Sequence, residues 1–376
     1  MQDKQSGGTP SVAIVHDYLT QRGGAERVVL SLAKAFPDAP IYVTLYDPEA
    51  TYDDFKQMDV RVSWLNRVPA FRKNHRLALP LLPFAAKSLR AKAAVVVASS
   101  SAFGHGVTTD GSLLVYCHTP PRFLYLSDEY LGSGLAGKVI GAALKPFKPM
   151  FRSLDQAAAS RAAKYLANSS VVQRRITDVY GIEADLMFPP HAIDTSGALA
   201  EISEATDLGE DYCLLVSRLL PYKNVDKVVE AFRSLPNRKL LIVGSGPMAA
   251  AIRASLPANV ALVSGITDDQ MRWAYANARF LVAPSFEDFG LTVIEGAAWG
   301  LPAVTLGAGG YLDTVVPGVT GLHFAEPTPA QIATAVEQAF ATEWEEGKIL
   351  AHAASFSEDK FIERIRSEAA LVVANR

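Results

Sequence analysis

The stretch FLVAPSFEDFGLTVIE, residues 280–295, is the most informative part of the sequence. It begins with an apolar run, Phe280–Ala283, which predicts a buried strand, and it ends in an apolar helical pattern that starts at Leu291. Glu287 stands on the intervening loop, and Glu295 stands about one turn into the helix. Because a helix rises only ~1.5 Å per residue, both carboxylates can face one ligand. The stretch therefore predicts a strand–loop–helix unit with a binding site at the end of the strand.

The loop of this unit is suited to an anion. Gly290 stands directly before the predicted helix, so the main-chain amides of Leu291 and Thr292 are available at the helix N-terminus, where phosphate binds well. We expect Phe289 to contact the same ligand. The two carboxylates can accept hydrogen bonds from ribose or sugar hydroxyl groups.

Short apolar runs alternate with helical patterns along the whole chain. The predicted strands are Ser11–Val15, Ala94–Ala98, Leu113–Tyr116, Tyr212–Val216, Lys239–Val243, Val260–Val263, Phe280–Ala283 and Ala303–Thr305. Such alternation produces parallel sheets covered by helices on both faces. A polar connector, Asp194–Asp211, separates two series. The sequence therefore predicts an α/β protein with two Rossmann-like domains, residues 1–195 and 196–355, which face each other across a cleft.

Composition narrows the class of protein. The chain has 376 residues, of which 49% are hydrophobic and 20% charged, with a net charge of −3, so it is neither disordered nor a globally basic nucleic-acid binder. The two cysteines, Cys117 and Cys213, are far apart, which excludes a disulfide framework and suits a reducing cytosol. The polar N-terminus does not read as a signal peptide, and no apolar run approaches the ~20 residues of a membrane span. We expect a soluble, cytoplasmic protein whose membrane contact is peripheral.

The small net charge hides an asymmetry between the two halves. Residues 1–195 hold 22 Lys and Arg against 17 Asp and Glu, whereas residues 196–376 hold 14 against 22. Two acid-free segments, 61–92 and 138–152, mix cations with apolar side chains. Such segments suit anionic lipid headgroups or a phosphorylated acceptor. The alternative is a solvated face whose apolar residues pack inward.

Two motifs in the first half lie at the ends of predicted strands. Gly23 and Gly24 precede the first helix, where paired glycines allow a phosphate to approach the helix N-terminus, although many strand-to-helix turns use Gly-Gly. His118 directly follows the strand that ends at Tyr116 and is followed by Pro120 and Pro121. It is placed to face a ligand, and the alternative is a structural histidine bonded to a carbonyl.

Two further motifs lie in the second half. Arg218 and Lys223 stand five apart after the strand Tyr212–Val216, where they can converge on a diphosphate or remain solvated. The run Gly244-Ser-Gly246-Pro resembles a dinucleotide-binding turn, but the acid expected about twenty residues later is missing. An NAD site is therefore the weaker interpretation of that run.

Together these motifs resemble the retaining glycosyltransferases of family 4, which have the GT-B fold. The resemblance rests on the Gly-Gly loop, the His-x-Pro-x-Arg segment, Arg-x4-Lys, Gly-x-Gly-Pro and Glu-x7-Glu in this order. The segment YCHTPPR, residues 116–122, is most similar to the corresponding segment of bacterial mannosyltransferases of O-antigen and exopolysaccharide synthesis. The resemblance implies that the C-terminal segment 356–376 packs back onto the first domain.

The resemblance also implies roles for the residues. Gly24 would lie beside the donor phosphates, and Arg218 and Lys223 would neutralise the diphosphate leaving group. Glu287 would contact the transferred sugar, His118 the same sugar near the reacting carbon, and Glu295 the ribose.

The reaction implied is the transfer of an α-mannosyl group from GDP-mannose to a lipid-linked or glycolipid acceptor at the inner face of the cytoplasmic membrane. Fixed cations would stabilise the leaving group, so no metal ion and no further cofactor are expected. A UDP-sugar donor carrying glucose or N-acetylglucosamine is the first alternative. A nucleotide-sugar epimerase and an NAD-dependent oxidoreductase are the other two.

Overall fold

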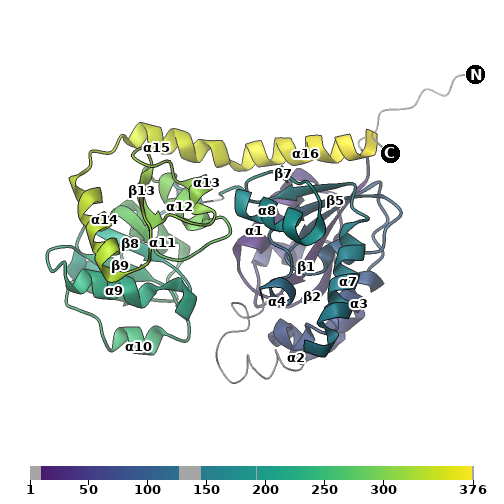
Figure 1. The fold of residues 1–376 in the computed structure, drawn as a ribbon, viewed down its shortest axis with the longest axis horizontal. Helices are drawn as coiled ribbons and strands as arrows, with labels where there is room; N and C mark the ends of the chain where they lie inside the picture. Colours follow the sequence, from purple (N-terminus) through teal and green to yellow (C-terminus); the bar gives the residue numbers. More distant parts are fainter. Residues whose placement is uncertain (1–9, 127–144, 192, 375–376) are drawn as a thin grey trace, which may run out of the picture. The chain divides into compact units, whose positions relative to one another are not determined.

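A computed structural model describes residues 10–126, 145–191 and 193–374. The chain divides into two compact units (Figure 1). Unit 1 comprises residues 1–190 together with 358–376, and unit 2 comprises residues 191–357. The sequence predicts the first boundary at 195 and the second at 355. The residues directly after Pro190 belong to unit 2, since Ile193 packs against its core and the amide of His191 donates to the carbonyl of Phe356 at 3.1 Å.

Unit 1 is built on a seven-stranded parallel sheet in the order β3-β2-β1-β4-β5-β6-β7. The strands are β1 (Val12–Leu19), β2 (Ile41–Tyr46), β3 (Val60–Val62), β4 (Val95–Ser100), β5 (Ser112–Cys117), β6 (Lys164–Ala167) and β7 (Asp185–Leu186). The central strands β4 and β5 are buried throughout, as expected for a parallel sheet covered on both faces. The strand order reverses between β1 and β4, and such a reversal is where open α/β sheets bind ligands.

The helices of unit 1 cover both faces of the sheet. They are α1 (Gly24–Ala35), α2 (Pro69–Lys73), α3 (Leu82–Ser88), α4 (Arg122–Tyr125), α7 (Lys148–Ala159), α8 (Ser170–Tyr180) and α16 (Glu358–Ala374). Helix α8 shows how local sequence sets the ends: the Ser169 hydroxyl accepts from the amide of Val172, and Gly181 ends the helix with a left-handed φ of 67°.

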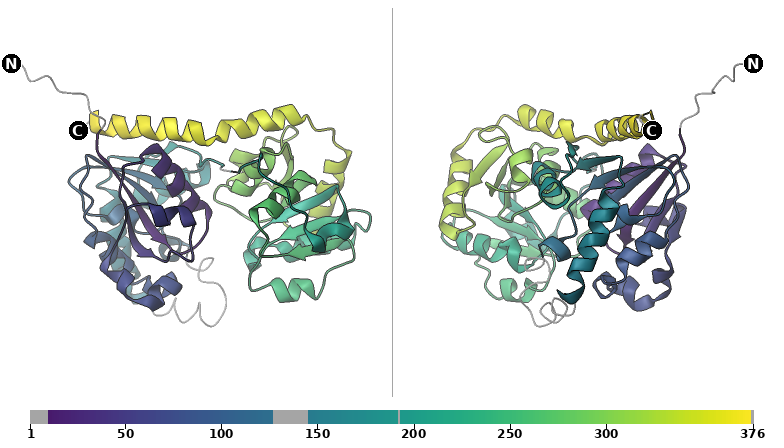
Figure 2. Two further views of the ribbon diagram at one scale, coloured as in Figure 1. Left: turned by 180° about the vertical axis from the view of Figure 1, so that it is seen from behind. Right: turned by 45° about the vertical axis from the view of Figure 1, so that its right-hand side comes forward.

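Helix α16 belongs to unit 1 although it is the last element of the chain (Figures 1 and 2). Its buried side chains recur every three or four residues, from Phe361 and Ile365 to Ala369 and Val372, and they share a core with α1 and the central strands. The ring of Phe361 packs edge-on against Tyr116 at 5.5 Å. The C-terminal segment is thus an integral part of the core of unit 1.

Unit 2 repeats the same strand order with six parallel strands, β10-β9-β8-β11-β12-β13. These are β8 (Tyr212–Val216), β9 (Leu240–Val243), β10 (Val260–Val263), β11 (Ala278–Ala283), β12 (Ala303–Leu306) and β13 (Gly321–Phe324). The helices are α9 (Val225–Arg233), α10 (Ala249–Arg253), α11 (Asp268–Ala276), α12 (Leu291–Ala297), α13 (Tyr311–Thr314), α14 (Pro329–Ala341) and α15 (Glu346–Ala353). The order reverses between β8 and β11, so the loops that follow these two strands lie side by side. Each unit is therefore a Rossmann-like domain, as the sequence predicted.

Candidate functional site

The loops after β8 and β11 bring together two of the predicted residues of unit 2. Lys223, which is 8% exposed, forms an ion pair with Oε1 of Glu287. The hydroxyl of Ser285 donates to the same oxygen at 2.7 Å. Both contacts engage Oε1, so Oε2 is the oxygen of Glu287 that is better placed to accept hydrogen bonds from a ligand.

Arg218 lies on the same loop as Lys223 but is exposed. Its guanidinium is 3.5 Å from the hydroxyl of Tyr222, and the ammonium of Lys223 lies 5.1 Å from the centre of the Tyr222 ring. The loop therefore places two cations around one exposed aromatic side chain. A buried lysine and an exposed arginine on one loop can bind the two phosphates of a diphosphate in different ways.

The backbone of the β11–α12 loop is fixed by glycines. Gly290 precedes α12 with φ of +91°, and a Cβ atom there would lie 2.4 Å from the ring of Tyr311. The amide of Gly310 donates to the carbonyl of Glu287 at 2.8 Å. Leu291 and Thr292 form the first turn of α12, directly after this constrained loop, and Phe289 is buried beneath it.

Tyr311 was not singled out by the sequence, although it lies beside the site. Its side chain is buried, and burial, together with the nearby charge of Glu287, raises its pKa well above 10. The phenol therefore stays neutral and packs against the loop that holds Glu287. The only sequence signal was its position after Gly309 and Gly310.

Glu295 lies on α12 and contacts a different element from Glu287. Its Oε2 accepts from the hydroxyl of Tyr275 on α11 at 3.2 Å. The ring of Tyr275 is buried and stacked parallel to Trp299, with centroids 6.5 Å apart. Tyr275 thus fixes the direction of Glu295, a role that the sequence did not reveal because the two residues lie on separate helices.

The Gly244-x-Gly246 run has a packing role in the structure. A Cβ atom at Gly244 would lie 2.0 Å from the carbonyl oxygen of Ser217, and the amide of Leu219 donates to the carbonyl of Ser245 at 2.8 Å. Gly244 is therefore required for close approach of the β9 loop to the loop that carries Arg218. This packing accounts for the glycine at position 244, so a dinucleotide-binding role is not needed to explain it.

In unit 1, His118 joins a hydrogen-bonded group at the carboxyl ends of three strands. Its Nε2 lies 2.7 Å from the hydroxyl of Ser99 on β4, and that hydroxyl lies 3.1 Å from Nδ1 of His16 on β1. Burial, with a smaller contribution from His16, lowers the pKa of His118 to about 3. His118 is therefore a neutral imidazole at physiological pH.

Gly23 and Gly24 lie where predicted, at the start of α1, but a carboxyl group already occupies part of this region. Glu26 is buried and accepts from Gln21 at 3.0 Å, and a Cβ atom at Gly23 would lie 2.5 Å from its Oε2. Burial raises the pKa of Glu26 against the opposing effect of His16. Gly24 is exposed beside it.

Asp17 is a buried residue of unit 1 that the sequence did not single out. Its carboxylate accepts from the amides of Ser101, Ala102 and Gly104 at 2.5–2.9 Å. These bonds tie the loop after β4 to the end of β1, and they stabilise the frame in which Ser99 and His16 lie.

The basic segment 61–92 is partly core and partly surface. Leu79 and Leu82 are buried, whereas Trp64, Leu77 and Phe84 are exposed. Some of its cations are paired, as Lys73 is with Asp47 at 3.0 Å. Lys87, Arg90 and Lys92 are exposed on and after α3. Of the second segment, 138–152, residues 138–144 lie outside the described residues. Phe147 and Met150 of its remainder are exposed near the start of α7, which contacts α3.

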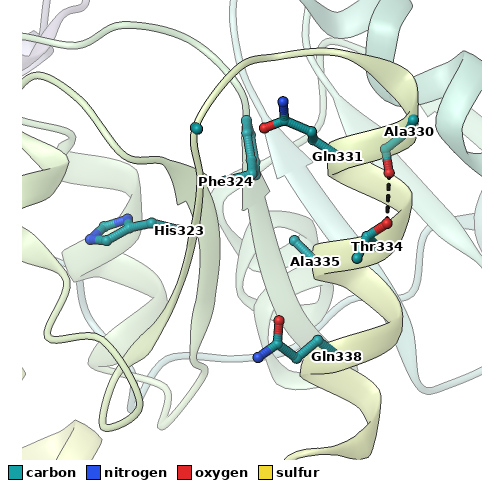
Figure 3. Close-up of a pocket in the computed structure, with 8 residues that line it drawn as sticks. His323, Phe324, Ala330, Gln331, Thr334, Ala335 and Gln338 are labelled. Carbon is teal, nitrogen blue, oxygen red and sulfur yellow. Dashed lines mark hydrogen bonds between the residues drawn. The ribbon is translucent and has the colours of Figure 1, made fainter.

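A separate open pocket of about 340 Å³ lies between β13 and α14 (Figure 3). Gln331, Thr334 and Gln338 line it from the helix, and none of the predicted site residues contributes. Among the residues that the structure describes, no group of three or more His, Cys, Asp or Glu side chains is arranged to hold a metal ion. Within the same described ranges, no helix combines the length and apolar character needed to cross a membrane.

Comparison with known proteins places these two units in one family. Residues 22–196 match Glycosyltransferase Family 4, and residues 200–355 match Glycosyl transferases group 1. The chain is 28% identical over 194 residues to the GDP-mannose-dependent alpha-(1-6)-phosphatidylinositol monomannoside mannosyltransferase of Mycobacterium tuberculosis, which covers 45% of this chain and 50% of that protein. It is 22% identical to the alpha-1,3/1,6-mannosyltransferase ALG2 of Homo sapiens, over 90% of this chain and 89% of that one.

The first relatives are thus matched over about half of their own length. Among solved structures, the sucrose-phosphate synthase of Thermosynechococcus elongatus superposes with a TM-score of 0.71 at 17% identity, over 97% of this chain and all of that one. This similarity concerns the fold. The two family matches together extend over nearly the whole chain, and the chain belongs to the family 4 glycosyltransferases with the GT-B fold.

Proposed function

We propose that the protein transfers an α-mannosyl group from GDP-mannose to a lipid-linked or glycolipid acceptor, with retention of configuration. The observation that carries this proposal is the Lys223–Glu287–Ser285 group at the point where the strand order of unit 2 reverses. A cation and a carboxylate at one strand edge suit a ligand that has a diphosphate at one end and hydroxyl groups at the other. The choice of mannose and guanine is supported by the names of the relatives from M. tuberculosis and other organisms.

We assign each residue the role that the family resemblance implies and that its contacts support. The departing nucleoside diphosphate develops negative charge, which Lys223 and Arg218 stabilise, and Lys223 is held in place for this by Glu287. Glu287 accepts hydrogen bonds from the transferred sugar through Oε2. Glu295, held by Tyr275, accepts from the ribose. The leaving phosphate itself helps to deprotonate the acceptor on the same face of the sugar, which gives retention.

Ligand-induced stabilisation and a transfer assay together test the donor. The full chain is heated with GDP, UDP or NAD, each at the same concentration. We expect GDP to raise the melting temperature and UDP and NAD to leave it unchanged, because a ligand that binds only the folded state stabilises it. Stabilisation by UDP alone would show that the donor is a UDP-sugar and not GDP-mannose. Stabilisation by NAD alone would contradict the proposal of glycosyl transfer. Transfer of labelled mannose from GDP-mannose to a polyprenyl-diphosphate-linked sugar then tests the acceptor.

We also propose that the protein binds peripherally to anionic lipids at the inner face of the cytoplasmic membrane. Exposed Phe84 and Lys87 are one turn apart on α3, and Arg90 and Lys92 follow. Apolar side chains flanked by cations bind the interface of an anionic bilayer, in a manner that salt weakens.

Vesicle binding tests the membrane proposal with a charge-matched control. Neutralising Lys87, Arg90 and Lys92 to Gln is expected to reduce sedimentation with phosphatidylglycerol-containing vesicles by about tenfold or more, since each cation contributes ~1 kcal/mol. Neutralising three exposed lysines of unit 2, Lys227, Lys239 and Lys348, changes the net charge equally and is expected to have little effect. Equal losses in the two variants would place the contact elsewhere.

A further inference from the structure

Ser99 lies between two histidines, and the sheet register accounts for this arrangement. His16 of β1 pairs with Ser99 of β4, and Ser99 pairs with Tyr116 of β5. Paired residues in a parallel sheet point to the same face, and His118 lies two positions beyond Tyr116. The side chains of His16, Ser99 and His118 therefore meet on one face of the sheet, with Ser99 fully buried between the two histidines.

The hydrogen atoms of this group can be assigned from what each partner is able to accept. Nδ1 of His16 lies 2.9 Å from the carbonyl oxygen of Ser99, and a carbonyl only accepts, so the proton of His16 is on Nδ1. His16 therefore cannot accept at Nδ1 the hydrogen of the Ser99 hydroxyl. The remaining partner of that hydroxyl among the described residues is Nε2 of His118, at 2.7 Å.

The reverse arrangement is unfavourable. If Nε2 of His118 carried the proton and donated it to Ser99, the hydrogen of the Ser99 hydroxyl would be buried without an acceptor, which costs about 1–3 kcal/mol. All hydrogen-bonding groups are satisfied only when His16 donates to Ser99 and the hydroxyl of Ser99 donates to His118. The low pKa of His118 agrees with it, because the ring then carries one proton, on Nδ1.

We propose that Ser99 and His16 are positioning residues that fix His118 as the Nδ1–H tautomer, so that His118 donates a hydrogen bond to an oxygen of the sugar. This inference rests on the proposed function and on the contact between His118 and the transferred sugar that the family resemblance implies. A histidine held this way is a neutral hydrogen-bond donor. Its Nδ1 cannot take the proton of the acceptor substrate's hydroxyl group, and its neutral ring does not repel a positively charged transition state. Hydroxyl and ring oxygens of a hexose are the acceptors that such a donor recognises.

The tautomer is measured first in the free protein, by NMR of ¹⁵N-labelled histidine, with His118→Asn to assign the signals. We expect wild-type His118 to be protonated at Nδ1 and unprotonated at Nε2. Ser99→Ala removes the donor and is expected to give a mixture or the Nε2–H form, whereas Ser99→Thr keeps the hydroxyl and restores the wild-type tautomer. The matched control is Ser112→Ala, a truncation of another buried serine at the opposite end of the same sheet.

Transfer kinetics then connect the tautomer to the reaction. Ser99→Ala is expected to lower kcat about tenfold with little change in the affinity for GDP, while Ser112→Ala keeps the wild-type kcat. A wild-type His118 protonated at Nε2, or a Ser99→Ala variant with unchanged tautomer and kcat, would overturn the inference. The NMR signals are read without donor or acceptor, so failure of the proposed reaction would not change the measured tautomer of His118. Failure of the tautomer prediction would likewise leave the proposed reaction standing.

Discussion

The two units have the same strand order, but the residues gathered where that order reverses differ in charge. In unit 2, Lys223 and Glu287 form an ion pair where the order reverses. In unit 1, the corresponding region holds neutral His118, the hydroxyl of Ser99 and Glu26, whose pKa is raised by burial. One backbone frame thus carries two kinds of site. Unit 2 suits a leaving group that gains negative charge, and unit 1 suits oriented hydrogen bonds to an uncharged ligand.

The largest effect should come from Glu287. Replacing it with Gln removes the carboxylate that pairs with Lys223 and that, in the proposed reaction, contacts the sugar, so we expect kcat to fall roughly a thousandfold or more. The measurement is mannosyl transfer, with circular dichroism to show an intact fold. Turnover close to wild type would remove Glu287 from the reaction and end the distinction between the units.

The two cations of unit 2 should differ from each other. Lys223→Met is expected to reduce kcat about a hundredfold, because Lys223 is buried and paired. Arg218→Ala, at an exposed position, is expected to cost about tenfold. Steady-state kinetics of both variants measure this order, and a greater loss in Arg218→Ala would show that the exposed cation is the main partner of the diphosphate.

Unit 1 makes a prediction about stability. Because burial lowers the pKa of His118 from 6.5 to about 3, this ring is protonated in the unfolded chain but not in the folded one between about pH 6.5 and pH 3. The contribution of His118 to the free energy of unfolding should therefore fall as the pH drops from about 6.5 toward 3. His75, with a pKa lowered by burial to about 4, acts in the same window.

The contribution of His118 is isolated by comparison with His118→Asn. Denaturant unfolding at pH 7 and pH 4 should show that the wild type loses more stability than the variant, by roughly 1–3 kcal/mol. His75 is present in both proteins and cancels. Identical pH dependence in the two would mean that His118 is not buried as a neutral ring.

The smallest expected effect is that of a chelator. If Lys223 and Arg218 supply the positive charge, EDTA should leave the transfer rate within about twofold of the untreated enzyme. A large loss that Mg²⁺ or Mn²⁺ restores would show that the cations of unit 2 are insufficient alone.

The sequence predicted the fold well because parallel strands buried on both faces are continuous apolar runs. It missed β2 (Ile41–Tyr46), although this strand is apolar and almost wholly buried, and it missed short strands such as β7 (Asp185–Leu186), which has little apolar character. It also placed Arg218, Lys223 and Glu287 on loops of one sheet edge, since such loops follow from strand positions alone.

What the sequence could not show are the contacts between separate elements. Ser99 and Asp17 lie within or at the ends of strands and have no motif, and their roles depend on the register of β1 with β4. Tyr275 meets Glu295 only because two helices pack together. The same applies to Gly244, which looked like part of a nucleotide turn but is required by the backbone of Ser217.

Calorimetric titration of GDP into Lys223→Met and into His118→Asn tests the division between the units most directly. We expect GDP affinity to fall at least about tenfold in Lys223→Met, because the diphosphate loses a buried cation, and to stay within about twofold of wild type in His118→Asn. Unchanged affinity in Lys223→Met, or an equal loss in both variants, would contradict the assignment of the nucleotide to unit 2.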